Sequence, residues 1–156
     1  MLRDRESVIE YHLGAREMSL IDLPTECSFG GNALRTTEDG GLGLANLVRN
    51  RLCLWSWEAG PDRDPGWVRS RAMDLRALLP DEALSTSLHV AGFACDIAAI
   101  FVLTHVGIFT VDLKSCRVAK VYEDGGCFDN FPYISFYTPG LRVASTKGPR
   151  MGTSNA

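Results

Sequence analysis

Histidines and cysteines are the side chains in this sequence that could hold a metal ion or carry redox chemistry. The three histidines, His12, His89 and His105, are far apart in the chain. The cysteines are equally scattered and include no Cys-x-x-Cys pair: Cys27, Cys53, Cys95, Cys116 and Cys127. Structural zinc sites and disulfide frameworks normally show closer pairing. We therefore expect reduced thiols, no metal site and no cofactor.

The short motifs of common enzyme chemistries are also missing. The sequence has no Gly-x-Ser-x-Gly elbow, no His-Glu-x-x-His and no phosphate-binding loop, and its glycines at 40, 41 and 43 lack the strand-then-helix context of a dinucleotide site. Two further enzyme classes occur on all-β scaffolds of the β-propeller type. A kelch-type oxidase would need clustered histidines for copper, and a glycosidase would need two carboxylates in one cleft. We expect no catalytic residue, and we keep a kelch-type oxidase or a glycosidase as the alternative.

Three tryptophans and two arginines could contact a ligand instead. Trp55, Trp57 and Trp67 could form a stacking platform, but tryptophans in neighbouring strands more often pack between sheets. Arg69 and Arg71 are two residues apart in an expected strand, which predicts that they share one face. They could bind an anion there or simply be solvated. We favour packing and solvation, so no partner-binding residue is assigned.

Short β-strands are the elements that would position these side chains. Residues 98–104 form an apolar run, residues 108–113 alternate between two faces, and residues 117–122 follow a tight connection. Together with residues 88–93 they predict a four-stranded antiparallel meander. Upstream hairpins are predicted over 8–12 with 17–23, and over 42–48 with 52–57, where Asn50 would take the positive φ of the turn.

The remaining segments are predicted from their turn residues. Residues 25–37 and 58–66 are rich in glycine, proline or charge, which indicates loops. After a strand at 67–73, Asp74 should cap one short helical turn that Pro80 ends. Cys116 lies at a turn where glycine is expected, so it would be strained if that position needs a positive φ. Residues 131–137 could be a last strand.

An internal repeat relates the two longer hairpins. Residues 44–56 align without a gap with residues 100–112, at a spacing of 56 (100 minus 44). A period of about 50 residues with four strands in each unit is typical of propeller blades of the kelch size, although a β-sandwich can give a similar pattern. The sequence therefore predicts an all-β fold of antiparallel four-stranded blades, about two and a half blades of an incomplete β-propeller over residues 1–140. Residues 141–156 would be a flexible tail.

Composition limits the class of partner. The 156-residue chain is 46% hydrophobic, which is enough for a sizeable core. Its net charge of −3 provides no excess of positive charge for binding nucleic acid or an anionic membrane. The charged start has no apolar signal region, and no apolar run reaches the ~20 residues of a spanning helix. We expect an intracellular protein, cytoplasmic or nuclear, that binds neither nucleic acid nor membrane.

Seven segments in this order resemble one family. They are EYHLG at 10–14, MSLIDLP at 18–24, LCLWS at 52–56, Trp67 leading to DLRALLP at 74–80, VAGF at 90–93, GIFTVDLK at 107–114 and PYISFYTP at 132–139. Read together, they resemble the C-terminal half of plant F-box proteins of the grass type. The resemblance implies an F-box-associated β-propeller domain that recognises protein targets of ubiquitination for an SCF-type ligase. The F-box itself, which docks on a Skp1-type adaptor, is missing, so adaptor docking cannot be assigned to any residue.

Our expectation for function is therefore a non-catalytic protein-interaction module, the C-terminal substrate-recognition part of an F-box protein. Loops at one end of the scaffold would recognise the target, because loops on a rigid framework can vary. A truncated gene product without ligase function remains an alternative, as does the propeller enzyme named above.

Overall fold

Three antiparallel β-sheets make up the fold. The computed structural model describes residues 6–27, 31–95 and 97–123. Within them, one sheet has two strands and the other two sheets have four strands each. The strands are β1 (Ser7–His12), β2 (Glu17–Asp22), β3 (Asn32–Thr36), β4 (Leu42–Val48), β5 (Arg51–Gly60), β6 (Arg63–Asp74), β7 (His89–Ala94), β8 (Ala99–Thr104), β9 (Gly107–Asp112) and β10 (Val118–Tyr122).

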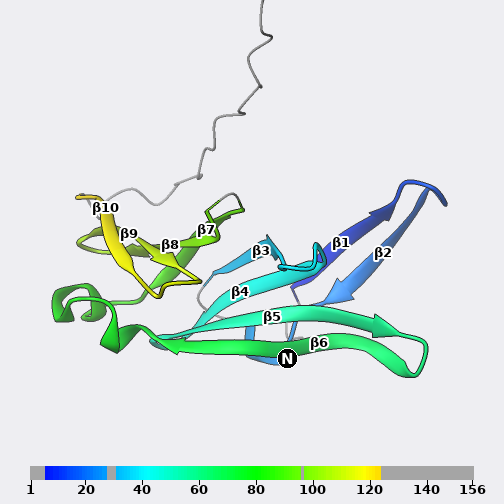
Figure 1. Cartoon of the computed structure of the whole chain (residues 1–156), viewed down its shortest axis with the longest axis horizontal. Helices are drawn as coiled ribbons and strands as arrows, with labels where there is room; N and C mark the ends of the chain where they lie inside the picture. The colour runs from blue at the N-terminus through cyan, green and yellow to red at the C-terminus, as the bar shows by residue number, and fades with distance from the viewer. Residues whose placement is uncertain (1–5, 28–30, 96, 124–156) are drawn as a thin grey trace, which may run out of the picture.

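Each four-stranded sheet is a meander in which sequential strands are neighbours. The orders are β3-β4-β5-β6 and β10-β9-β8-β7, and all pairs are antiparallel. The first strands of the two sheets, β3 and β7, lie against each other. Figure 1 shows the two sheets side by side, with the β1–β2 hairpin projecting at the end away from β7–β10. The predicted all-β class, the four-stranded meander and the β1–β2 hairpin are confirmed.

The internal repeat corresponds to equivalent hairpins. The β4–β5 pair joins Val48 to Arg51, and the β8–β9 pair joins Thr104 to Gly107, which are the same positions at the spacing of 56 (104 minus 48). Both hairpins form the middle of their sheet. A two-residue connection forces the antiparallel pairing in each case. The repeat in sequence is therefore a repeat in structure.

The main hydrophobic core lies between the two four-stranded sheets. One face of β3–β6 contributes Ala45, Leu47, Leu52 and Leu54, and β8 and β9 contribute a facing set, Ile100, Val102, Phe109 and Val111. Leu52, Ile100, Val102 and Val111 are completely buried. These residues recur at every second position of their strands, so one side of each strand faces the other sheet. Stacked sheets bury apolar faces that neither could bury alone.

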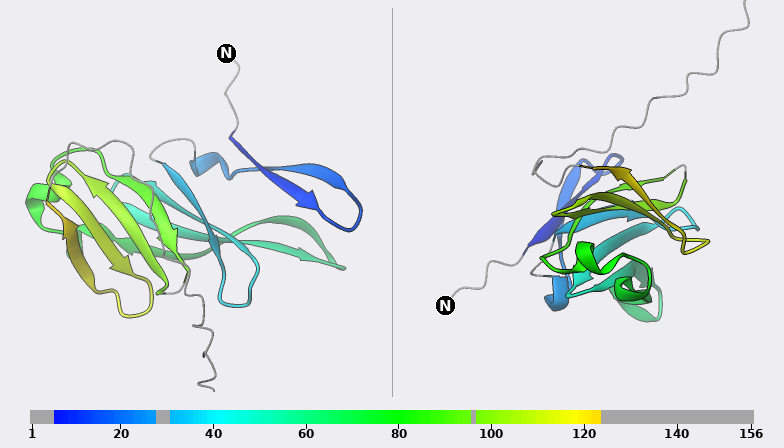
Figure 2. Two further views of the ribbon diagram at one scale, coloured as in Figure 1. Left: turned by 90° about the horizontal axis from the view of Figure 1, so that it is seen from above. Right: turned by 90° about the vertical axis from the view of Figure 1, so that its left-hand side faces the viewer.

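A second, smaller core covers the opposite face of β3–β6. It contains Cys27, Leu44, Cys53 and Trp55, with Leu23 and Trp67 packed against them. Cys27 belongs to η1, a 3-10 helix over Thr25–Cys27. Figure 2 shows how the segment after β2 returns to this side of the sheet. The β3–β6 sheet is therefore covered on both faces.

Two segments predicted as loops contain regular structure. Residues 25–37 hold η1 and β3, and residues 58–66 continue β5 and β6 into a long hairpin that pairs Gly60 with Arg63. β3 is five residues long, and Ala33 is its one buried residue, so its sequence shows little alternation of apolar and polar side chains. Its pairing with β4 holds it in place. The 58–66 hairpin is exposed as predicted, because its charged residues suit solvent.

The helical content exceeds the single predicted turn. Asp74 caps η2 (Leu75–Ala77) as expected, since its Oδ1 accepts a 3.0 Å hydrogen bond from the Arg76 backbone N–H. The Arg76 guanidinium also donates to this carboxylate and lowers the pKa of Asp74 to about 2. Besides η1, a third 3-10 helix, η3, covers Asp81–Leu84. These turns are too short to leave a periodic pattern.

Among the described residues, four that are not glycine have a positive φ: Arg16, Arg49, Ala98 and Cys116. The strain expected at Cys116 is confirmed by its φ of 57°. The turn between β4 and β5 uses Arg49, with φ 59°, and the prediction of Asn50 for this role is wrong. In a type II′ turn only the first of the two central residues needs a positive φ, which is the pattern at Arg49.

Replacing Ala98 by glycine should stabilise the protein. The φ of Ala98 is 48°, a conformation that costs an L-residue about 1 kcal/mol and glycine much less. We expect Ala98→Gly to raise the free energy of unfolding by about 0.5–1 kcal/mol. The control is Ala99→Gly in β8, where a buried alanine in strand conformation should cost about 1 kcal/mol when replaced. Urea denaturation measures the free energy of unfolding of both variants. If the two substitutions changed it in the same direction, the prediction would be contradicted.

Two expected features lie outside the described residues, namely the strand at 131–137 and the tail at 141–156. Among the residues that are described, no helix has the length and apolar character needed to cross a membrane.

Candidate functional site

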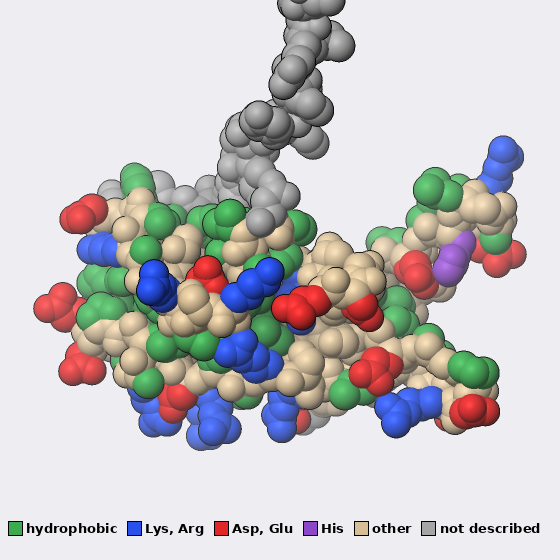
Figure 3. Space-filling view, viewed as in Figure 1, with side chains coloured by type: hydrophobic (Ala, Val, Ile, Leu, Met, Phe, Trp, Pro, Cys, Tyr) green, Lys and Arg blue, Asp and Glu red, His purple; other side chains and the backbone are tan. Residues whose placement is uncertain are grey.

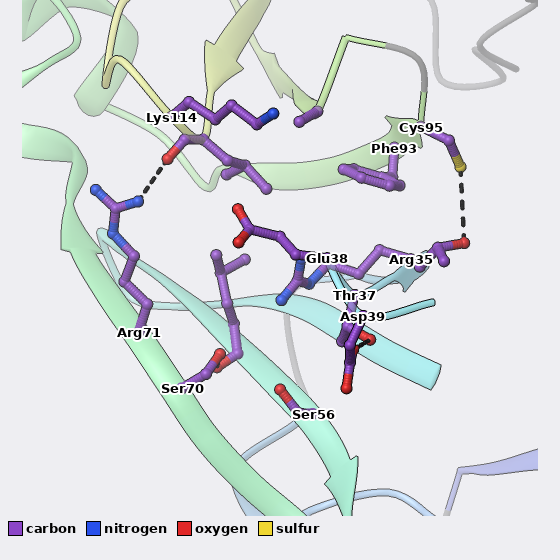
Figure 4. A pocket seen from close by; sticks show the side chains of 14 residues that line it. Arg35, Thr37, Glu38, Asp39, Ser56, Ser70, Arg71, Phe93, Cys95 and Lys114 are labelled. Carbon is purple, nitrogen blue, oxygen red and sulfur yellow. Dashed lines mark hydrogen bonds between the residues drawn. The ribbon is translucent and has the colours of Figure 1, made fainter. Parts of the chain in front are cut away.

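A cleft of about 840 Å³ lies between the two four-stranded sheets, beside the main core. From β3–β6 come Arg35, Ser56, Ser70 and Arg71, and Glu38 and Asp39 belong to the β3–β4 turn. The other side is lined by Phe93 of β7 and by residues that directly follow β7 and β9, namely Cys95, Leu113 and Lys114. Figure 4 shows Arg35 and Glu38 in the middle of the cleft. The main core between the two sheets is lined by apolar side chains, whereas the cleft beside it is lined mainly by polar ones.

Arg35 reaches the cleft because Gly43 leaves room for it. Gly43 is opposite Arg35 in the β3–β4 pair, and a Cβ there would lie 2.9 Å from Cγ of Arg35. The stem of Arg35 therefore lies directly over the glycine. Partial burial lowers the pKa of the Arg35 guanidinium, and the nearby Glu38 carboxylate partly offsets this shift. The buried Nε of Arg35 has no hydrogen-bond partner among the described residues.

Arg71 connects the two sheets at one side of the cleft. Its guanidinium donates to the Leu113 carbonyl and contacts the Cys116 Sγ at 2.9 Å. Both acceptors belong to the segment between β9 and β10, so this one side chain links β6 to the other sheet. On the other side of the cleft, the Thr36 hydroxyl is 3.9 Å from the Cys95 Sγ. Figure 4 draws this contact as the dashed line that ends at Cys95.

Arg69 and Arg71 are on opposite faces of β6, and the prediction that they share a face is wrong. The β5–β6 register pairs Leu54 with Arg71 but Trp55 with Arg69, which leaves Ser70 as the extra residue of a β-bulge. A bulge inserts one residue and reverses the alternation beyond it. Arg69 accordingly lies over the Trp55 ring, with its Cζ 5.9 Å from the ring centroid, and pairs with Glu26 at 3.5 Å.

The two carboxylates at the cleft are exposed neighbours in a turn. Asp39 accepts hydrogen bonds from the Thr37 hydroxyl and the Gly41 backbone N–H, which lower its pKa. Glycoside hydrolysis needs an acid with a raised pKa opposite a second carboxylate. Glu38 and Asp39 do not form such a pair. Their charge instead balances part of the positive charge of Arg35, Arg71 and Lys114.

The tryptophans pack, as favoured, although Trp55 and Trp67 do so in the small core and not between the two large sheets. Trp55 is buried and its Nε1 donates to Asn46 Oδ1 at 2.9 Å. Trp57 and Trp67 form an edge-to-face pair with ring centroids 5.3 Å apart. The Trp67 Nε1 donates to the Asp22 carbonyl at 2.9 Å. The Trp67 bond attaches the end of β2 to the β3–β6 sheet.

The histidines and cysteines remain scattered in the fold. On β1, the Nε2 of His12 is 3.2 Å from a carboxylate oxygen of Glu10. His105, in the turn between β8 and β9, contacts the hydroxyl of Thr86, which lies between η3 and β7. Within the described part of the chain no three His, Cys, Asp or Glu side chains are grouped to hold a metal ion. Cys27, Cys53, Cys95 and Cys116 are free, and Cys127 lies outside the described residues. Burial raises the pKa of Cys27 to about 12, which makes this thiol unreactive at neutral pH.

The lining of the cleft could contact a ligand through several kinds of group. It offers guanidinium and ammonium donors, two carboxylate acceptors, two serine hydroxyls and the apolar side chains of Leu54 and Phe93. Mixed donors, acceptors and apolar surface in one groove match the groups of an extended polypeptide. No sequence motif predicted this cleft, because its residues come from both halves of the repeat. Comparisons with protein-family models, with curated proteins and with solved structures find no match for this chain.

Proposed function

We propose that this chain is a protein-interaction module, built as blades of a β-propeller, and that the cleft between the two four-stranded sheets receives a segment of its protein target. By the resemblance to grass-type F-box proteins, that target would be one selected for ubiquitination. Meander sheets stacked face to face, with their first strands β3 and β7 together, are the arrangement of adjacent propeller blades. This arrangement supports the blade interpretation.

The observation that carries the proposal is Arg35. Its Nε is buried without a hydrogen-bond partner among the described residues, and its guanidinium lies in an open cleft. Buried donors are normally satisfied, and an unsatisfied one costs about 1–3 kcal/mol. A polypeptide carbonyl or carboxylate bound in the cleft would accept from the terminal guanidinium nitrogens of Arg35, since Nε itself is covered. Because the stem of Arg35 is already held over Gly43, binding loses less side-chain entropy there than at an exposed arginine.

Peptide selection against the full chain tests this function. We expect a displayed library of random peptides to yield binders whose affinity falls at least about tenfold in Ser56→Trp, because the indole would fill the cleft from the β5 side. Ser87→Trp is the matched control, since Ser87 is exposed in the η3–β7 connection. Circular dichroism verifies that both variants fold. Binders that are equally sensitive to both changes, or no binders at all, would refute the proposal.

A further inference from the structure

We propose that the β1–β2 hairpin forms an interface with the same hairpin of a second copy of this chain. Antiparallel pairing places Ile9 opposite Leu20 and Tyr11 opposite Met18, so these four side chains share one face of the hairpin. We call these four residues the hairpin face. Leu13 extends it at the tip. The opposite face carries polar side chains in the same outer part, where Glu10 accepts a 3.0 Å hydrogen bond from Ser19.

The hairpin face is exposed although it is apolar. The exposed fractions are 68% for Ile9, 53% for Tyr11, 75% for Met18, 70% for Leu20 and 84% for Leu13. Other large exposed hydrophobic residues in the described part of the chain, such as Leu34 and Ile97, are distributed over separate segments. In Figures 1 and 3 the hairpin extends beyond the rest of the molecule and carries hydrophobic surface. Contiguous apolar patches of this kind normally mark an interaction surface.

The base of the hairpin is fixed while the outer part has no packing partner among the described residues. Ile21 is buried, Leu23 N–H donates to the Glu6 carbonyl at 3.1 Å, and Trp67 holds the Asp22 carbonyl. A two-stranded sheet on its own is marginally stable, and neither edge of this one pairs with another strand of the described residues. A further apolar layer over the hairpin face would therefore stabilise it.

The size of the hairpin face suits a symmetric dimer. With Leu13 it presents on the order of 500 Å² of apolar surface, so two copies would together bury about 1,000 Å², which is the lower limit for a specific interface. None of its five side chains is charged, so no charge loses its hydration when the face meets its own copy. A two-fold axis needs only one self-complementary patch, and an apolar sheet face meets that condition.

Charge at the two ends of the hairpin sets the orientation. Asp22, paired with Ser7, lies at the base on the side of the hairpin face, and Arg16 lies in the turn at the tip, whereas the other charged residue at the tip, Glu17, lies on the opposite face. When two hairpins stack in antiparallel fashion, the tip of each lies near the base of the other, so unlike charges approach. Parallel stacking would bring like charges together at both ends. We therefore place the two-fold axis across the middle of the hairpin face.

The mass of the full chain in solution tests the dimer. We expect sedimentation velocity to show twice the chain mass of 17.1 kDa at high concentration and dissociation on dilution. The double variant Ile9→Lys/Leu20→Lys should raise the dissociation constant at least about a hundredfold. The matched control is Leu34→Lys/Ile97→Lys, which places the same two charges at exposed hydrophobic positions elsewhere and should leave the dimer intact. Circular dichroism verifies that each variant folds.

A charge exchange tests the orientation separately. Arg16→Glu should weaken the dimer about tenfold, and Arg16→Glu combined with Asp22→Arg should restore most of that loss. A chain that stays monomeric at every concentration, or a dimer that the hairpin variant leaves unchanged, would overturn the inference. Equal dissociation of the hairpin variant and the control would do so as well. Peptide binding in the cleft is a separate readout, so neither result decides the other.

Discussion

Replacing Ile100 by alanine should lower the free energy of unfolding by about 3 kcal/mol, whereas Ile97→Ala should change it by less than about 0.5 kcal/mol. The two isoleucines are three positions apart, but Ile100 is completely buried in the main core and Ile97 is 61% exposed. The loss at Ile100 has two parts, namely the transfer of the removed methyl groups and the cavity that remains between the sheets.

Urea denaturation of the two isoleucine variants measures this difference. A shared core predicts one cooperative transition for the wild type and for Ile97→Ala, with the midpoint of Ile100→Ala at clearly lower urea. If the two changes had equally small effects, the sheets would not be packed on each other. The blade interpretation would then lose its physical basis.

Replacing Trp55 by phenylalanine should cost about 2–3 kcal/mol, because it leaves a buried amide oxygen without a donor. Asn46 is completely buried, and its Oδ1 accepts the 2.9 Å bond from Trp55 Nε1. Trp67→Phe is the matched control. It removes the bond to the Asp22 carbonyl in an exposed setting, where water can replace the donor, and should cost about 1 kcal/mol or less.

A second substitution separates the hydrogen bond from the packing of the ring. In Trp55→Phe/Asn46→Leu the unpaired oxygen is gone, so we expect the double variant to recover about 1 kcal/mol relative to the sum of the single changes. Thermal and urea denaturation of the four proteins complete the cycle. Additive losses would show that the Asn46–Trp55 bond contributes nothing beyond packing.

Local sequence patterns predicted the strands whose own residues show a hydrophobic run or an alternation of apolar and polar side chains. Residues 99–103 are apolar on both faces and none of them is fully exposed in β8, and residues 107–112 alternate because one side of β9 faces the other sheet. Asp74 before η2 followed the capping preference of short carboxylates. The spacing of 56 residues between the two middle hairpins was visible for the same reason, since each copy repeats the same alternation.

Other elements could not be predicted because distant partners determine them. β3 has one buried residue and is a strand because β4 pairs with it. Arg69 and Arg71 are separated by the bulge at Ser70, and a bulge is a property of the β5–β6 register that neither strand shows alone. Arg49 takes the positive φ that the residue type favours at Asn50, since the register between β4 and β5 decides which residue comes first in the turn.

The sequence by itself therefore determined the all-β class, the meander order of the sheets and most of the hairpins, because hydrophobic alternation and turn residues act over a few positions of the chain. Only the tertiary structure decided where Arg35 and Lys114 meet in a cleft, and which side of β1–β2 is left exposed. Both features depend on the way separate sheets stack. Stacking is set by side chains that are far apart in the chain, and no local pattern records it.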